Sequence, residues 1–203
     1  MERPTTGETL RREGPPTPPR QSASVILVRD GADGVELLLV QRNPRQRFMG
    51  GFWVFPGGAV DATESHRATA VRELDEEAGV GAVEPEALVL YSRWITPELI
   101  ETRFDTRFFL ARAPGGVQPR VDGQECVDLR WTTPRAAVDA YARGELALVF
   151  PTLKLLEGLA PFATAGELLA HARGLSVQPI LPRIVLADEK PRVLLPGEPG
   201  YDV

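Results

Sequence analysis

Three glutamates crowd one turn of a predicted helix, in the stretch "RELDEEAGV" that runs from Arg72 to Val80. Glu73, Glu76 and Glu77 lie close enough for their charges to repel by a few tenths of a kcal/mol per pair in water, and by more in a desolvated cleft. A divalent cation removes that repulsion, and carboxylate oxygens are the hard ligands that Mg²⁺ or Mn²⁺ prefers. The spacing therefore indicates a metal site, and the alternative is an ordinary solvated helix face.

The helix that carries these glutamates is expected to bury its other side. With about 100° of rotation per residue, the apolar residues and the three glutamates fall on opposite faces. Gly79 is expected to end the helix as a left-handed residue. A Pro-Gly-Gly turn in the aromatic stretch "GFWVFPGG" precedes the helix. The apolar face comprises Ala68, Val71, Leu74 and Ala78.

The residues around the glutamates resemble the Nudix box, the signature of the Nudix hydrolase family. The box reads G-x5-E-x7-R-E-U-x-E-E-x-G-U, where U is aliphatic, and the chain fits every specified position from Gly58 to Val80. The resemblance implies an α/β fold, the Nudix α/β/α sandwich, in which the box forms a loop, a helix and a loop on a mixed sheet. It also implies a diphosphatase that depends on Mg²⁺ or Mn²⁺ and cleaves a nucleoside diphosphate linked to another group.

The same resemblance assigns roles to the box residues. Arg72 and Glu64 would form an ion pair that holds the metal ligands in place. Glu73 or a neighbour would orient the attacking water. The implied reaction is attack of a metal-activated water on one phosphorus of the diphosphate, with charge on the leaving phosphate neutralised by the metal. The implied metal ligands are Glu73, Glu76, Glu77 and the backbone carbonyl of Gly58.

The upstream segment "LLVQRNPRQRFMGGFWVFPGG" is similar to the motif of coenzyme A diphosphatases within the family, L-L-T-x-R-[SA]-x3-R-x3-G-x3-F-P-G-G. Val40 and Asn43 depart from this motif, which has Thr and Ser or Ala there. The resemblance implies that coenzyme A or acyl-coenzyme A is cut to adenosine 3',5'-bisphosphate and 4'-phosphopantetheine or its acyl form. The alternative substrates are ADP-ribose, a dinucleotide or a nucleoside triphosphate. An alternative of another class is a Nudix-fold binding or regulatory module without catalysis.

A chain with a net charge of −5 needs a local basic patch to bind such a polyanion. Arg42, Arg45 and Arg47 lie in the upstream segment and could bind the phosphates of coenzyme A. Gly57 and Gly58 of the following turn are expected to approach the same substrate. The alternative is that the three arginines are ordinary charges of a surface loop.

Several residues outside the box are weaker candidates. Glu125, in "GQECVDLRW", is either a further metal ligand or base, or a surface glutamate. Cys126 is expected to be a buried strand residue, because no paired His or second Cys accompanies it in a nucleophile motif. His66 and His171 are expected on helix surfaces. The strand aromatics that could either stack on adenine or pack in the core are Trp94, Phe104 and Phe108.

The length of 203 residues and a hydrophobic content of 43% favour one globular domain with extensions. We expect a flexible proline-rich arm over 1–21, the Nudix domain over 22–150, and a helical extension with a tail packed on the domain over 151–203. The stretches "SVILVRD" and "VELLLVQR" predict strands joined at "GADG", and "ALVLYSRWIT", "TRFDTRFFLAR" and "CVDLRWTT" predict three more. Helices are expected over 134–143 and, as one or two, over 151–173, followed by a hairpin around "ADEKP".

The composition also limits the partners and the compartment. The acidic balance argues against a general nucleic-acid binder, and no apolar run has transmembrane length. A single cysteine and a start without an apolar h-region favour a soluble, cytoplasmic protein. The expected partner is a small nucleoside diphosphate, and the sequence leaves a homodimer open.

Overall fold

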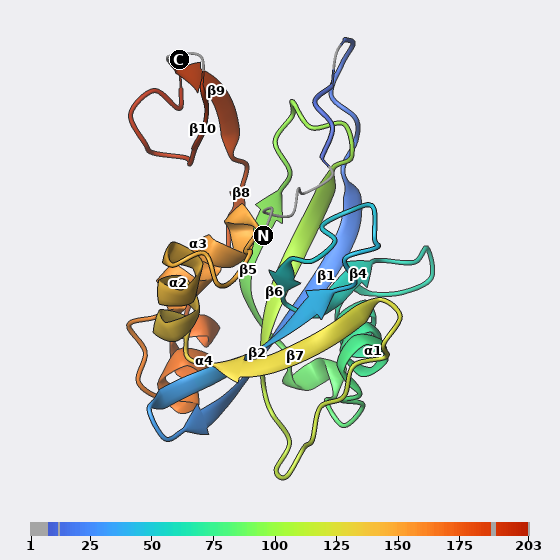
Figure 1. The fold of residues 1–203 in the computed structure, drawn as a ribbon, viewed down its shortest axis with the longest axis vertical. Coiled ribbons are helices and arrows are strands. Elements are labelled where there is room, and N and C mark those ends of the chain that lie inside the picture. Colours follow the sequence, from blue (N-terminus) through green and yellow to red (C-terminus); the bar gives the residue numbers. More distant parts are fainter. Residues whose placement is uncertain (1–7, 12, 188–189, 203) are drawn as a thin grey trace.

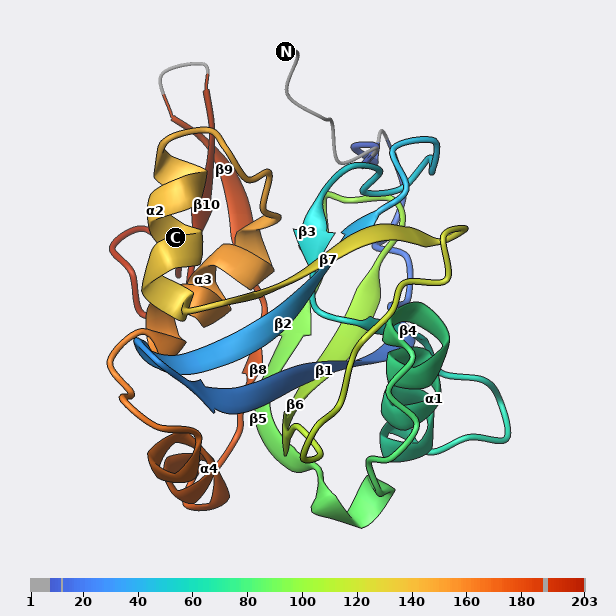
Figure 2. The same ribbon diagram turned by 60° about the horizontal axis from the view of Figure 1, so that its bottom comes forward.

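The computed structural model describes residues 8–11, 13–187 and 190–202 of the chain (Figures 1 and 2). Its helices are α1 (His66–Ala78), α2 (Pro134–Ala142), α3 (Phe150–Leu159) and α4 (Ala165–Arg173), with a 3-10 turn η1 (Pro85–Ala87). Its strands are β1 (Arg20–Gly31), β2 (Gly34–Arg42), β3 (Trp53–Val54), β4 (Gly57–Ala59), β5 (Val89–Ile95), β6 (Phe104–Arg112), β7 (Cys126–Thr132), β8 (Pro179–Ile180), β9 (Arg183–Ala187) and β10 (Lys190–Leu194).

Most of the strands form one mixed sheet around β1. The order is β3-β2-β1-β6-β5-β8, with β4 paired to β1 and β7 paired to β2. The pairing of β1 with β6 is parallel, whereas β1 and β2 form an antiparallel hairpin that closes at Gly31 and Gly34. Gly34 has a φ of 116°, which a side chain would resist. The predicted hairpin at "GADG" is therefore confirmed.

Helices cover both faces of the sheet, and Figure 2 shows α1 on one side and α2 to α4 on the other. Residues of β1 are buried in alternation toward the two layers, as expected for a central strand. Val25 packs in one cluster with Leu74 of α1, while Ile26 packs in a second cluster with Leu156 of α3 and Leu168 of α4. The predicted α/β/α architecture with a mixed sheet is confirmed.

Two strands pair with different halves of β1, and this arrangement positions the Pro-Gly-Gly turn. β2 pairs with the second half of β1, whereas β4 pairs with the first half through Ser22 and Ala59 and through Ser24 and Gly57. Pro56 cannot donate a backbone hydrogen bond, but its carbonyl accepts one from Val25 at 2.9 Å. The turn that precedes the Nudix-like helix is thus fixed to the central strand.

The C-terminal part of the chain adds to this domain. The region 151–173 forms two helices, and β9 and β10 form the predicted hairpin, of which positions 188–189 lie outside the described residues. Strand β8, which pairs with β5 in parallel, was not predicted, because two residues carry no periodic signal. The division into a domain over 22–150 and an extension over 151–203 stays a prediction.

Strand β1 begins at Arg20, two residues before the predicted domain boundary and within the region assigned to the arm. Earlier residues contact the loop before β6: the backbone N–H of Arg11 donates to Leu99 at 2.8 Å, and Thr9 accepts from Glu101 at 2.9 Å. The flexibility of 1–21 stays a prediction, and 1–7 and 12 lie outside the described residues. In the described part of the chain, no helix has the length and apolar character to cross a membrane.

Candidate active site

The ends of α1 fix the position of its glutamates. The Ser65 hydroxyl accepts a hydrogen bond from the backbone N–H of Ala68 at 3.2 Å and so caps the first turn. At the other end, Gly79 has a φ of 64° and donates from its backbone to Asp75 at 2.8 Å. The helix therefore ends at the predicted left-handed glycine.

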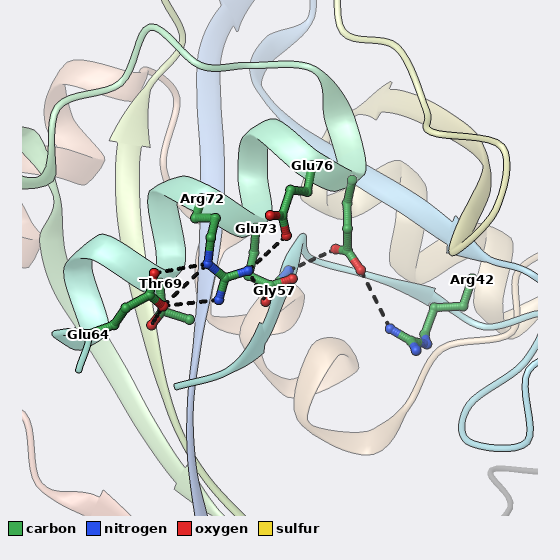
Figure 3. A network of polar contacts seen from close by, with 8 residues as sticks. Arg42, Gly57, Glu64, Thr69, Arg72, Glu73 and Glu76 are labelled. Carbon is green, nitrogen blue, oxygen red and sulfur yellow. Dashed lines mark hydrogen bonds and ion pairs between the residues drawn. The ribbon is translucent and has the colours of Figure 1, made fainter. Parts of the chain in front are cut away.

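Arg72 is the centre of an ion-pair network at the surface of α1 (Figure 3). Its guanidinium lies 3.1 Å from Glu64, 2.9 Å from Glu73 and 2.8 Å from Glu76. Glu64 also accepts a hydrogen bond from the hydroxyl of Thr69 at 2.9 Å. These contacts raise the pKa of Arg72, and the hydrogen bond from Arg72 lowers the pKa of Glu64. The predicted pair of Arg72 and Glu64 is present, and Thr69 is an additional partner that the box pattern does not specify.

Glu77 is buried, which corrects the expectation that it shares an exposed face with the other glutamates. Only 2% of the residue is exposed, because Glu77 borders the Leu74 side of α1 and lies against the glycine turn. One carboxylate oxygen accepts from the backbone N–H of Gly57 at 2.9 Å. The other lies 3.6 Å from Arg42 and has no hydrogen-bond partner. Burial raises the pKa of Glu77 to about 7, against the opposing effects of Gly57 and Arg42.

Glu73 fills the space beside Gly58. A Cβ added at Gly58 would lie 2.3 Å from a carboxylate oxygen of Glu73, so a larger residue would displace that side chain. Burial raises the pKa of Glu73 although Arg72 lowers it, and the charge of Glu125 contributes to the rise. Gly58 is thus required for the close approach of Glu73. A ligand role for its carbonyl stays a prediction.

The three carboxylates of α1 have the chemistry that a divalent cation requires, although their oxygens do not converge on one point. Across the described ranges, no three Asp, Glu, His or Cys side chains form a ready-made metal cluster. Glu73 and Glu76 instead form ion pairs with Arg72. Glu77 nevertheless has a buried oxygen without a hydrogen-bond partner, and all three groups are hard oxygen donors. The donor chemistry therefore fits a divalent cation, and the metal role of Glu73, Glu76 and Glu77 stays a prediction.

A pocket of about 650 Å³ opens onto this network. Glu125 is exposed and belongs to the pocket wall, and its charge contributes to the raised pKa of Glu73. By contrast, Arg45 and Arg47 are exposed on their loop and lie outside the wall, so their substrate role stays a prediction. The other predicted site residues in the wall are Arg42, Gly57, Gly58, Arg72, Glu73 and Glu76.

The aromatic candidates all line the pocket, and two of them also belong to the core. Trp94 and Phe108 belong to the hydrophobic core and also line the pocket. Phe104 lines the pocket and packs against Phe48 in a tilted arrangement, their ring centres being 5.7 Å apart. Stacking on adenine stays a prediction. The sequence did not mark the apolar part of the wall that is contributed by residues 148–152 and by Pro182, Ile184 and Val193, where no motif indicates a site.

The remaining candidates from the sequence are Cys126, His66 and His171. Cys126 is fully buried, and burial raises the pKa of its thiol well above the ordinary range, so a reactive thiolate is disfavoured. His66 contacts Gln21 at 2.9 Å, and burial and the charge of Arg107 lower its pKa. His171 is exposed on α4 beside a phenylalanine ring. We find no chemical role for these three residues.

Comparisons with known proteins point to the same family as the box pattern. A family model for the NUDIX domain matches residues 18–153. The human acyl-coenzyme A diphosphatase NUDT19 is 27% identical, with 84% of this chain and 73% of that protein covered. A Mycobacterium tuberculosis protein provisionally named 8-oxo-dGTP diphosphatase 3 is 30% identical, with 72% and 67% covered. Among solved structures, a NUDIX hydrolase from Alicyclobacillus acidocaldarius has a TM-score of 0.68 at 27% identity, with 76% of this chain and 96% of that chain covered.

Proposed function

The chain belongs to the Nudix hydrolase family, and on that premise we propose that it is a coenzyme A or acyl-coenzyme A diphosphatase dependent on Mg²⁺ or Mn²⁺. Members of the family are diphosphatases that generally use divalent metal ions and act on small substrates containing a diphosphate. The proposed products are adenosine 3',5'-bisphosphate and 4'-phosphopantetheine or its acyl form. The cytoplasmic location and the homodimer remain predictions from the sequence.

One observation carries the proposal: the pocket wall joins the box carboxylates and Arg42 to a large apolar surface. A nucleoside triphosphate is anionic along its length beyond the sugar, whereas acyl-coenzyme A presents a diphosphate and then a long, weakly polar arm. The upstream segment that contains Arg42 matches the coenzyme A motif at most of its positions. The similarity to human acyl-coenzyme A diphosphatase NUDT19 supports the same choice.

The residues have separate tasks in this proposal. Glu73, Glu76 and Glu77 would hold the metal, which when bound supplies charge neutralisation at the diphosphate and an activated water. Arg72 keeps the carboxylates of α1 in a fixed arrangement through its pair with Glu64. Gly57 orients the Glu77 carboxylate through its backbone N–H.

A second candidate function is the hydrolysis of a modified nucleoside triphosphate. It is favoured by the 30% identity to the Mycobacterium tuberculosis protein named for 8-oxo-dGTP. ADP-ribose and dinucleotides are further alternatives within the hydrolases. A binding module without catalysis is disfavoured by the intact box.

The 3'-phosphate of coenzyme A provides the test of substrate recognition. We expect wild-type protein to prefer coenzyme A over dephospho-coenzyme A, which lacks only this phosphate. Losing one charge-assisted contact with it should lower kcat/KM for coenzyme A by about 10-fold. Arg47→Ala should remove the preference while dephospho-coenzyme A is still cleaved. Steady-state kinetics on both substrates checks this expectation.

Arg42→Ala is the companion variant, because Arg42 also lies 3.6 Å from Glu77. Arg42→Ala should lower kcat/KM for both substrates. If Arg42 also contacts the 3'-phosphate, kcat/KM for coenzyme A should fall further. Arg135→Ala removes the same charge from an exposed position of α2, outside the pocket wall, and serves as the control for net charge. If wild type cleaves the two substrates equally well, recognition of the 3'-phosphate is excluded and the arginine segment no longer supports the coenzyme A assignment.

A further inference from the structure

The pocket extends beyond the carboxylates to a wall without charge. Its contributors from the C-terminal part of the chain come from two places, the start of α3 and the hairpin of β9 and β10. Figure 1 shows this hairpin at the upper left, beyond α3 and β8. None of the contributing side chains carries a charge. They are Leu148, Val149, Phe150, Pro151, Thr152, Pro182, Ile184 and Val193.

The register of the hairpin explains which of its residues reach the pocket. Ile184 and Val193 are directly opposite in the antiparallel pair, so their side chains lie on the same face. Both line the pocket. Val185 pairs with Arg192 one position along, and these side chains lie on the other face because the strand period is two. One face of the hairpin is therefore aliphatic and turned toward the pocket.

The hairpin is attached to the domain at its base. Leu194 is only 4% exposed, and Leu195 packs against the core cluster beneath α3 and α4. The Tyr201 hydroxyl donates to the backbone carbonyl of Leu181 at 2.7 Å, and Arg183 donates to the carbonyl of Tyr201. These contacts hold the residues on both sides of the hairpin, so its aliphatic face has a defined place in the wall.

We propose that the start of α3 and the β9–β10 hairpin form a subsite for an aliphatic chain carried by the group on the far side of the substrate diphosphate. Phosphate, ribose or adenine buried here would lack polar partners, since Thr152 is the one hydroxyl among the contributing side chains. An aliphatic chain loses nothing by leaving water and is stabilised by burial. The inference rests on the proposed function, in which the chain is the acyl group of acyl-coenzyme A.

Two substrate series test the subsite independently of coenzyme A. The first runs from acetyl- to palmitoyl-coenzyme A, and the second consists of ADP esters with methyl to hexadecyl groups on the second phosphate. For wild type, kcat/KM should rise at least ~10-fold along a series, as burial of several methylenes allows. Calorimetric Kd values for the same compounds report binding without requiring turnover.

Ile184→Ser and Val193→Ser should each reduce that rise to about twofold, because each places a hydroxyl on the aliphatic face. Val185→Ser is the matched control on the opposite face of the same strand and should keep the wild-type dependence. Circular dichroism and the melting temperature confirm that each variant is folded. The two serine variants lie on different strands, so an unfolded variant leaves the other as the test.

The outcomes separate the subsite from the proposed function. A chain-length dependence that the two variants weaken in either series supports the subsite. If this dependence occurs only with the ADP esters and the coenzyme A thioesters are not cleaved, the subsite is supported and the coenzyme A assignment is wrong. If wild-type kcat/KM and Kd ignore chain length, or both serine variants keep the full dependence, the subsite is overturned even where coenzyme A is cleaved.

Discussion

Glu77→Gln is expected to lower kcat by at least ~100-fold while the fold remains intact, because it removes a charged ligand from stabilisation of the transition state. The substitution keeps the size of the side chain and an oxygen that can accept from Gly57. Stopped-time assays of product with saturating metal measure the loss. Asp75→Asn removes one charge from an exposed position of the same helix and should stay within about twofold of wild type.

In metal-free buffer, the difference in stability between Glu77→Gln and wild type should depend on pH. Burial raises the folded pKa of Glu77 from 4.5 to about 7, so the protonated form is favoured in the folded protein. The stability that it contributes is complete below pH 4.5 and is lost as the pH rises through about 7. The variant stays neutral, so its melting temperature should gain on wild type between about pH 5 and about pH 8. For the turnover prediction, near wild-type kcat of the Glu77→Gln variant with an unchanged circular dichroism spectrum would contradict a metal role for Glu77.

Removal of the metal is expected to lower turnover by about 1,000-fold, since charge neutralisation by a metal is worth several kcal/mol in the transition state. Dialysis against a chelator followed by an assay measures this loss. Added Mg²⁺ or Mn²⁺ should restore turnover and raise the melting temperature, because the ion binds the folded carboxylates. Glu73→Gln should reduce the rise in melting temperature. Full activity in chelator, or a melting curve that millimolar metal leaves unmoved, would indicate that the glutamates form only a solvated face.

The elements with strong local signals could be predicted from the sequence. The β1–β2 hairpin, α1 with its terminal Gly79, and the strands β5 to β7 lie where alternation, turn residues and capping residues indicate. The pair of Arg72 and Glu64 follows from the box pattern and is present. These features depend on residues close in the chain or on a pattern with fixed spacing.

Features that depend on packing could not be predicted. The burial of Glu77 results from β4 pairing with β1, which brings Gly57 against the helix, and a helical wheel contains no information about that neighbour. The attachment of Glu73 and Glu76 to Arg72 reflects the distance between side chains in the fold. Likewise, the apolar wall joins residues 148–152 to Pro182, Ile184 and Val193, which are distant in the sequence and carry no motif.

The most direct measurement is a substrate panel with separation of the products. Coenzyme A, octanoyl-coenzyme A, ADP-ribose, a diadenosine polyphosphate, ATP and 8-oxo-dGTP are each incubated with the protein and Mg²⁺ or Mn²⁺, and the products are identified by chromatography. We expect the highest kcat/KM for a coenzyme A compound, with adenosine 3',5'-bisphosphate and the phosphopantetheine product formed in equal amounts. Recovery of intact coenzyme A compounds while 8-oxo-dGTP or ADP-ribose is consumed would contradict the proposed function.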